Sequence, residues 1–191
     1  HPLIGITGSN GKTVVKEWLS TLLDNDKNIY QSPKSYNSQL GVALSLWNLT
    51  NEYEIALIEA GISEMHEMHK LEAMIRPNIG VFTNIGMAHA EGFSTKGDKI
   101  KEKMKIFEQA DVLIFPSKYD LEDYVPAGCA VFSWGQKAND RLQVLAVEES
   151  LRQETSVHLR YEGQDCIIRL PFEDRASVEN GITCVATLLY L

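Results

Sequence analysis

The chain has 191 residues, 44% of them hydrophobic and 23% charged, so it is long enough to bury a substantial core. Its formal net charge of -8 argues against a nucleic-acid partner, because phosphate backbones select basic protein surfaces. No apolar run is long enough to span a bilayer and no signal peptide is recognisable, so we expect a cytoplasmic protein without a membrane partner.

The first expected element is a short apolar strand that runs into a glycine-rich loop and then into a helical pattern. Residues 4–13 read Ile-Gly-Ile-Thr-Gly-Ser-Asn-Gly-Lys-Thr, a compact variant of the phosphate-binding loop, because the usual first glycine would fall at Ile6. In such a loop the glycines let backbone N–H groups approach phosphate oxygens, Lys12 reaches the terminal phosphates and the Thr13 hydroxyl can ligate Mg²⁺. The alternative is a glycine turn before a helix that carries a lysine by chance.

The next strong signal is a continuous apolar run at residues 55–61, after a short strand at 28–31 and a helix at 40–49. A run of this kind is typical of a strand covered on both faces. Glu59 stands at its C-terminal end, the edge of a parallel sheet where ligands bind, so it is well placed to hold the Mg²⁺ of a nucleotide. A helix-capping or surface role for Glu59 is the alternative.

A helix is expected over residues 64–75 and a strand over 79–85. His66 and His69 belong to that helix but have i, i+3 spacing rather than the i, i+4 spacing of a zinc-protease motif, so we interpret them as surface residues. His89 follows the strand and should share the sheet edge with Glu59. It is therefore a candidate metal ligand, with an ordinary loop histidine as the alternative.

The following helix, expected at residues 98–109, carries a lysine on its apolar side. Ile100, Met104 and Phe107 mark an apolar stripe, and Lys103 falls between them. A lysine on a buried face is costly unless its ammonium reaches solvent or is neutralised, and the spacing leaves both outcomes open.

The remaining pattern predicts an α/β fold with an antiparallel extension. Apolar strands at 112–115 and 130–133 continue the alternation of strands and helices, which indicates a mostly parallel sheet flanked by helices. Residues 143–171 change rhythm and predict three strands, at 145–149, 156–161 and 166–170, before a final helix at 178–191.

The cysteines and the two ends of the chain complete the expectations. Cys129, Cys166 and Cys184 are isolated in apolar surroundings, so we expect buried, reduced thiols. The chain opens at His1 without Met and stops at Leu191 inside a helical pattern, so we expect residues 1–191 to be one domain of a longer polypeptide.

Three motifs in order carry a resemblance to a known family. They are the loop at residues 7–13, the strand end Glu59-Ala60-Gly61, and residues 84–93, which read Asn-Ile-Gly-Met-Ala-His-Ala-Glu-Gly-Phe. Together they resemble the central ATPase domain of the Mur ligases of peptidoglycan synthesis, and most closely the MurF branch. The resemblance covers nearly the whole chain. It implies a three-domain protein in which flanking domains bind a uridine nucleotide substrate and the incoming amino acid or dipeptide.

The resemblance also implies roles for individual residues. ATP phosphates would lie on the loop, with Lys12 at the β and γ phosphates; the loop residues are Gly8, Ser9, Asn10, Gly11, Lys12 and Thr13. Thr13 and Glu59 would ligate one Mg²⁺. His89 would ligate a second, supported by a carbamate formed on Lys103, which would make Lys12, Lys103 and His89 the catalytic set.

Three asparagines complete the implied site. Asn84 and Asn180 would contact the nucleotide, Asn180 at the adenine, although Ser177 stands where the family often has a histidine. Asn37 lies in a segment that resembles a family loop near substrate and metal, with fewer asparagines than usual.

The reaction implied is an ATP-dependent amide ligation in two steps. A carboxylate of UDP-N-acetylmuramoyl-tripeptide attacks the γ-phosphate of ATP to give an acyl phosphate and ADP, and the amine of D-alanyl-D-alanine then displaces phosphate. We expect a monomer whose central domain alone is inactive. Alternatives are another Mur ligase or a folylpolyglutamate synthase-like ligase, or a GTPase switch, which would need an N-K-x-D motif that the sequence lacks.

Overall fold

The computed structural model describes residues 2–86, 93–149 and 154–191. The helices are α1 (Lys12–Leu23), α2 (Gln39–Trp47), α3 (Met68–Ile75), α4 (Lys96–Met104) and α5 (Arg175–Tyr190), with short 3-10 turns η1 (Lys105–Phe107), η2 (Ser117–Tyr119) and η3 (Glu122–Tyr124). The strands are β1 (Leu3–Thr7), β2 (Ile29–Gln31), β3 (Ile55–Glu59), β4 (Ile79–Phe82), β5 (Val112–Pro116), β6 (Ala130–Gly135), β7 (Leu142–Glu149), β8 (Thr155–Tyr161) and β9 (Gln164–Leu170).

In these described ranges the strands form one nine-stranded sheet in the order β2-β3-β1-β4-β5-β6-β7-β8-β9. Every pairing from β2 to β7 is parallel, and β1 lies between β3 and β4. β3 and β5 are buried along their whole length, because helices cover both faces of the sheet. The predicted α/β fold with a mostly parallel sheet is confirmed.

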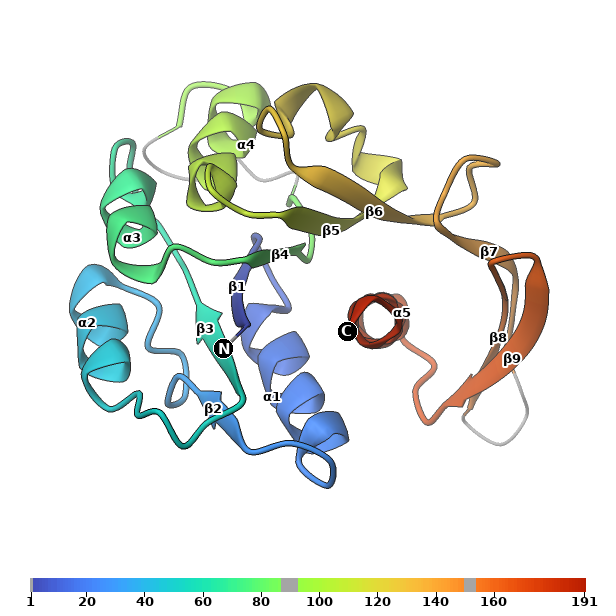
Figure 1. Cartoon of the computed structure of the whole chain (residues 1–191). Helices are drawn as coiled ribbons and strands as arrows, with labels where there is room; N and C mark the ends of the chain where they lie inside the picture. The colour runs from blue at the N-terminus through green and yellow to red at the C-terminus, as the bar shows by residue number, and fades with distance from the viewer. Residues whose placement is uncertain (1, 87–92, 150–153) are drawn as a thin grey trace.

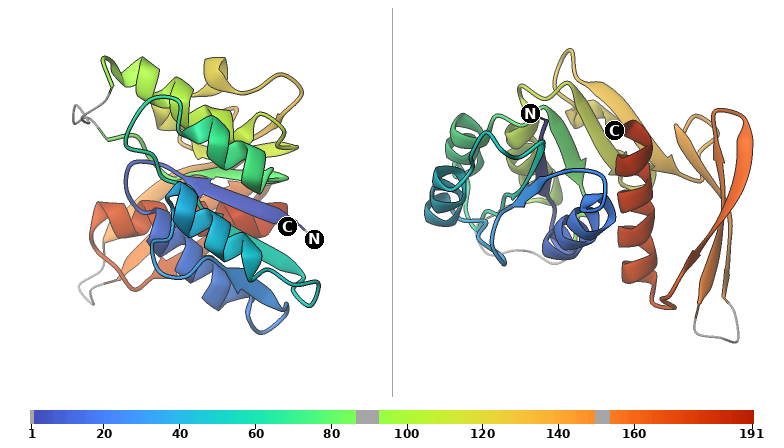
Figure 2. Two further views of the ribbon diagram at one scale, coloured as in Figure 1. Left: turned by 90° about the vertical axis from the view of Figure 1, so that its left-hand side faces the viewer. Right: turned by 60° about the horizontal axis from the view of Figure 1, so that its bottom comes forward.

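Two helical layers enclose the sheet (Figures 1 and 2). On one face, Leu19 of α1 and Ile182 of α5 join one hydrophobic cluster with the side chains of the strands above them. On the other face, Leu71 of α3, Met104 of α4 and Phe107 of η1 join a second cluster. The carboxyl ends of the parallel strands therefore open at one edge, between the two layers.

The antiparallel extension is a continuation of the same sheet. β7 pairs in parallel with β6 over two residues and then antiparallel with β8, which forms a hairpin with β9. The three strands curve beside α5 (Figure 1). Leu170 of β9 packs closely against Gly181 of α5: a Cβ added at Gly181 would lie 3.0 Å from Leu170 Cδ1. The extension thus gives α5 a second surface to pack against.

Two predicted helices differ from the observed ones. The helix expected from residue 64 begins only at Met68, because the backbone N–H groups of Ser63 and Glu64 donate to the Glu67 carboxylate and form a turn. His66 lies in that turn with φ of 67°, so its placement on the helix was wrong. The helix expected at 98–109 is α4 followed by η1 and ends at Phe107.

The cysteine prediction was wrong for two of three residues. All three are free, as expected, but only Cys184 is buried; Cys129 is partly exposed and Cys166 is exposed. Cys166 lies on β9, the outermost strand of the sheet, which has no helix on its open side. Among the described residues, no helix has the length and apolar character needed to cross a membrane.

Gly80 in β4 leaves room for the Phe107 side chain of η1, which packs directly against the strand. A Cβ there would lie 2.5 Å from Phe107 Cδ1 and 2.9 Å from Leu113 Cδ1. We expect Gly80→Ala to destabilise the protein by about 1–3 kcal/mol, because a packed core resists an extra methyl group. Urea unfolding measures the change. In the control Gly97→Ala the nearest atoms are 3.5 Å away, so equal losses in both variants would contradict this explanation.

Candidate functional site

The loop between β1 and α1 requires glycine at two positions. Gly8 has φ of 148° and Gly11, the N-cap of α1, has φ of 78°. A Cβ at Gly8 would lie 2.0 Å from Thr83 Oγ1, and one at Gly11 would lie 2.4 Å from Asn180 Oδ1. Both the backbone conformation and the crowding exclude other residues, and the backbone N–H groups at the start of α1 are left available for an anion.

The end of β4 holds this loop in shape. The backbone N–H of Asn10 donates to Asn84 Oδ1 (2.9 Å), and Asn84 Nδ2 donates back to the Asn10 carbonyl (3.0 Å). The Thr83 hydroxyl donates to the same carbonyl (2.6 Å), and the Ser9 N–H donates to the Asn84 carbonyl (2.8 Å). The Asn84 amide therefore supports the loop itself, and its predicted contact with a nucleotide stays a prediction.

Two lysines from distant parts of the chain meet at the loop. Lys12 Nζ donates to the Gly8 carbonyl (3.2 Å), and Lys103 Nζ donates to the same oxygen (3.1 Å). Lys103 is only 3% exposed, so its ammonium does not reach solvent. Burial lowers the pKa of Lys12, and burial followed by the charges of Lys12 and Lys99 lowers the pKa of Lys103 to about 7. Lys103 is thus partly neutral near physiological pH.

Helix α4 is anchored so that Lys103 faces inward. Its N-cap, Thr95, accepts a hydrogen bond from the backbone N–H of Asp98 (3.0 Å). Beside Lys103, the fully buried Glu102 accepts from the backbone N–H of Met68 (3.1 Å) and pairs with Lys105 Nζ (2.5 Å). The hydrogen bond between Glu102 and Met68 ties α4 to α3, next to the position of Lys103.

Glu59 lies at the end of β3, as the sequence predicted, and is 1% exposed. Its Oε2 accepts from the Thr13 hydroxyl (2.7 Å) and its Oε1 accepts from Asn37 Nδ2 (2.7 Å). The structure therefore brings Thr13, Glu59 and Asn37 together at one edge of the sheet. A carboxylate beside a hydroxyl provides the oxygen donors that Mg²⁺ prefers.

The loop, both lysines, Asn37 and Gly61 line a pocket of about 560 Å³. Glu59 and Thr13 lie behind this lining, where Glu59 contacts Asn37. Within this loop the Ser9 hydroxyl is buried without a hydrogen-bond partner in the described residues, which fits a donor to a phosphate oxygen. The residues present thus fit both a nucleotide phosphate chain and Mg²⁺.

The predicted metal ligand His89 lies outside the described residues. Within the part of the chain that is described, no group of three or more His, Cys, Asp and Glu side chains gathers at a potential metal site. Of the expected ligands that the structure describes, only Glu59 is one of these four residue types. Thr13 would bind through its hydroxyl and Lys103 through a carbamate. The ligand roles of all four stay predictions.

The sequence reasoning missed Lys16. It is 0% exposed, and its Nζ donates to the backbone carbonyl of Ser32 (2.6 Å), next to the loop that carries Asn37. The available signal was its place in α1 beside Val15 and one turn before Leu19 and Ser20, on a helix packed against the sheet. A lysine at the margin of a buried stripe is usually read as solvated, which explains the omission.

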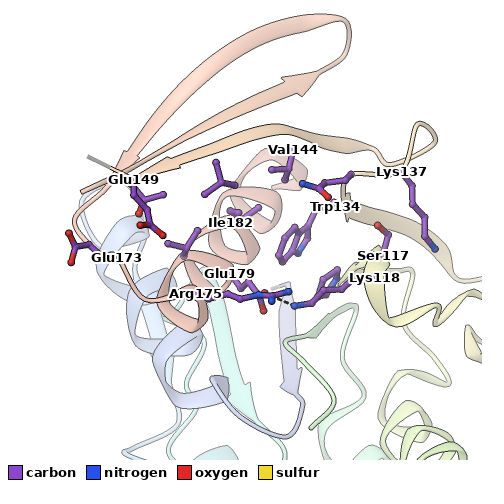
Figure 3. A pocket seen from close by; sticks show the side chains of 16 residues that line it. Ser117, Lys118, Trp134, Lys137, Val144, Glu149, Glu173, Arg175, Glu179 and Ile182 are labelled. Carbon is purple, nitrogen blue, oxygen red and sulfur yellow. Dashed lines mark hydrogen bonds and ion pairs between the residues drawn. The ribbon is translucent and has the colours of Figure 1, made fainter. Parts of the chain in front are cut away.

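A second pocket, of about 570 Å³, lies between α5 and the strands β6 and β7 (Figure 3). Trp134, Val178 and Ile182 form its apolar wall, and Glu179 at its rim pairs with Lys118 and Arg175. Asn180 lies on the other side of α5, against Gly11. The helix therefore separates this pocket from the loop, and none of the predicted site residues that the structure describes lines it.

A family model described as the Mur ligase middle domain matches residues 6–188. The UDP-N-acetylmuramoyl-tripeptide–D-alanyl-D-alanine ligase of Bacillus subtilis (strain 168) is 25% identical over 191 residues, which cover 98% of this chain and 41% of the relative. The ligase of the same name from Borreliella burgdorferi is 38% identical over 103 residues, which cover 54% of this chain and 22% of the relative.

Solved structures agree with the fold. A crystal structure of MurF from Acinetobacter baumannii matches with a TM-score of 0.86 and 25% identity, over 98% of this chain and 42% of that one. MurF ligase from Thermotoga maritima in complex with ADP has the same fold, with a TM-score of 0.86 and 22% identity over 99% of this chain and 45% of that one. The chain spans less than half the length of these relatives.

The lowered pKa of Lys103 makes stability depend on pH. Because the pKa of Lys103 is about 7 in the folded protein and 10.5 for an ordinary, solvated lysine, the burial penalty is fully present below pH 7 and is relieved as pH rises toward 10.5. We expect Lys103→Met to stabilise the Mg²⁺-free protein at pH 6.5. This gain should shrink above pH 7 by at most about 1.4 kcal/mol per pH unit.

Urea unfolding of both proteins in CO₂-depleted buffer at pH 6.5, 7.5 and 8.5 measures the difference. Lys101→Met, at an exposed position of the same helix, is the control and should show no such trend. A difference between Lys103→Met and the wild type that stays constant with pH would show that Lys103 keeps an ordinary pKa.

Proposed function

The chain belongs to the Mur ligase middle domain family, and we propose that it provides the ATP- and Mg²⁺-binding site of a peptidoglycan-precursor ligase. The proposed whole protein joins D-alanyl-D-alanine to UDP-N-acetylmuramoyl-tripeptide through an acyl phosphate. The names of the relatives support this choice of substrates. The observation that carries the ATP site is the meeting of Lys12 and Lys103 at the Gly8 carbonyl, beside the Thr13–Glu59 pair.

In the proposed site the loop binds the phosphate chain. Backbone N–H groups at the start of α1 and the buried Ser9 hydroxyl would donate to phosphate oxygens, and Lys12 would place its charge at the β and γ phosphates. Lys12 lies against the loop through its hydrogen bond to the Gly8 carbonyl, so its charge is already directed to the phosphate-binding side. Catalysis of phosphoryl transfer by such a site is mainly positioning and charge stabilisation.

Thr13 and Glu59 would hold Mg²⁺ at the same edge. The cation would neutralise charge on the phosphates during transfer. Asn37 would keep Glu59 oriented, because its amide occupies one carboxylate oxygen and leaves the other at Thr13. Asn180, which lies against Gly11, would contact the adenine, and Asn84 would act through the loop that it supports.

Lys103 suits the proposed carbamate. With a pKa of about 7, a substantial fraction of the Lys103 side chains is neutral. The nitrogen attacks CO₂, a C–N bond forms as one C=O π bond opens onto oxygen, and the nitrogen loses a proton through the pocket that Lys103 lines, which gives an anion. Lys12 and Lys99 lower the pKa of the cation by repulsion and would attract the carbamate instead. With His89, the carbamate would support a second Mg²⁺.

We also propose that the protein acts as a monomer in the cytoplasm, where ATP is abundant. Its nucleotide-sugar peptide and D-alanyl-D-alanine would be bound mainly by parts of the protein outside these 191 residues. The pocket of about 560 Å³ would then receive the ends of these substrates that react.

Lys12→Ala in the natural-length protein should lower ligase turnover by about 100-fold or more, because it removes a preorganised charge from the transferring phosphate. Phosphate release from ATP with both substrates present measures turnover. Lys70→Ala, at an exposed lysine of α3, is the control and should keep wild-type turnover. Wild-type turnover in Lys12→Ala would remove the phosphate-loop assignment.

Lys103→Ala should also cripple turnover, and short carboxylic acids such as acetate should restore part of it by replacing the lost carbamate. Lys101→Ala, two residues away and exposed, should need no rescue. In wild-type protein prepared with ¹³CO₂, carbon NMR should show a carbamate signal that Lys103→Ala lacks. Full turnover of Lys103→Ala without added acid would refute the carbamate.

A further inference from the structure

Lys16 is among the largest fully buried side chains of the described protein, and it carries a charge. Its Nζ donates to the backbone carbonyls of Ser32 and Lys34, the first at 2.6 Å. A buried ammonium is costly unless its hydrogen bonds are made, and two carbonyls of one short loop accept from two of its three N–H groups here. Lys16 therefore holds that loop against helix α1.

The loop in question is residues 32–37, which follow β2. Pro33, Lys34 and Ser35 are exposed, and Lys34 has φ of 47°, in the left-handed region that a residue with a side chain rarely adopts. Such a conformation persists only where surrounding contacts impose it. The hydrogen bond from Lys16 to the Lys34 carbonyl is a contact of this kind.

Both ends of the loop touch Glu59. At the start, the Ser32 hydroxyl accepts from the backbone N–H of Glu59 (3.2 Å). At the end, Asn37 Nδ2 donates to Glu59 Oε1 (2.7 Å), and the Asn37 carbonyl accepts from the backbone N–H of Gly61 (2.9 Å). A displacement of the loop would therefore release one oxygen of the Glu59 carboxylate.

Helix α1 thus reaches Glu59 by two routes. Thr13 contacts Oε2 directly at 2.7 Å, and Lys16, three residues later, reaches Oε1 through the loop and Asn37. The two routes close a ring that fixes the carboxylate from both sides. Removal of Lys16 opens the ring at a link that does not line the pocket and does not contact the Glu59 carboxylate by a hydrogen bond.

We propose that Lys16 is a positioning residue for the Mg²⁺ site: it fixes the 32–37 loop, and through Asn37 it holds the Glu59 carboxylate in the orientation that presents Oε2 beside Thr13. This inference rests on the proposed function for the identity of the cation. The link from Lys16 to the loop stands on the contacts alone.

The test uses Lys16→Met, Asn37→Ala and the double variant in the natural-length protein. We expect each single variant to raise the Mg²⁺ concentration for half-maximal turnover by about 10-fold, the size typical of a lost contact behind a metal ligand. The turnover number at saturating Mg²⁺ should change much less. Lys16 and Asn37 act through one path. The Mg²⁺ concentration for half-maximal turnover of the double variant should therefore lie within about twofold of the higher of the two single-variant values.

Two readouts do not depend on turnover. Hydrogen exchange in the nucleotide-free protein should be faster at residues 32–37 in Lys16→Met. Binding of ADP without Mg²⁺, measured by calorimetry, should remain as in the wild type, because the phosphate loop is untouched. Lys27→Met, at an exposed lysine just beyond α1, is the control and should change none of these measurements.

Lys16→Gln, which keeps a hydrogen-bond donor, is tested in parallel so that a folding defect of Lys16→Met leaves the question decidable. A lower melting temperature of Lys16→Met with an unchanged Mg²⁺ requirement would overturn the proposal. So would a double variant whose increase in Mg²⁺ requirement equals the product of the two single-variant increases. If the wild type shows no Mg²⁺-dependent turnover, the proposed function fails; unchanged hydrogen exchange in both Lys16 variants would separately refute the link to the loop.

Discussion

The candidate site depends on a single oxygen, the carbonyl of Gly8, on which two ammonium groups converge. Lys12 comes from the adjacent helix, and Lys103 from a helix 95 residues further along the chain. Two like charges at one acceptor repel each other, and burial adds to the cost, so the arrangement is unfavourable without an anion. The rest of the site is consistent with a place prepared for negative charge, which is the demand that a phosphate chain makes.

The contacts around this oxygen explain why so much of the chain is used to support the loop. Thr83 and Asn84, directly after β4, hold the loop, and α3 holds α4 through the bond from the Met68 N–H to Glu102, next to Lys103. On the other side, Glu59 is held between Thr13 and Asn37. The two lysines therefore line the pocket while the carboxylate is held behind Asn37, and the hydrogen bonds of the two groups go to different partners.

Much of this arrangement could be read from the sequence where a residue type has one dominant physical use. The glycines and Lys12-Thr13 after an apolar strand predicted the loop, and the apolar run of β3 placed Glu59 at the correct edge. Patterns with two uses were less informative: the start of α3 was missed because Glu67 caps a turn instead of continuing a helix, and Cys166 was expected inside although it lies on the edge strand.

By itself the sequence determined the alternation of strands and helices and the order in which the site residues follow them, because periodicity and turn chemistry are local properties. Only the tertiary structure decided that Lys103 reaches Gly8, that Lys16 is buried against the 32–37 loop, and that β7–β9 continue the main sheet. These facts depend on contacts between segments far apart in the chain. Whether a lysine is solvated or buried is decided by what packs over it, and no local pattern contains that information.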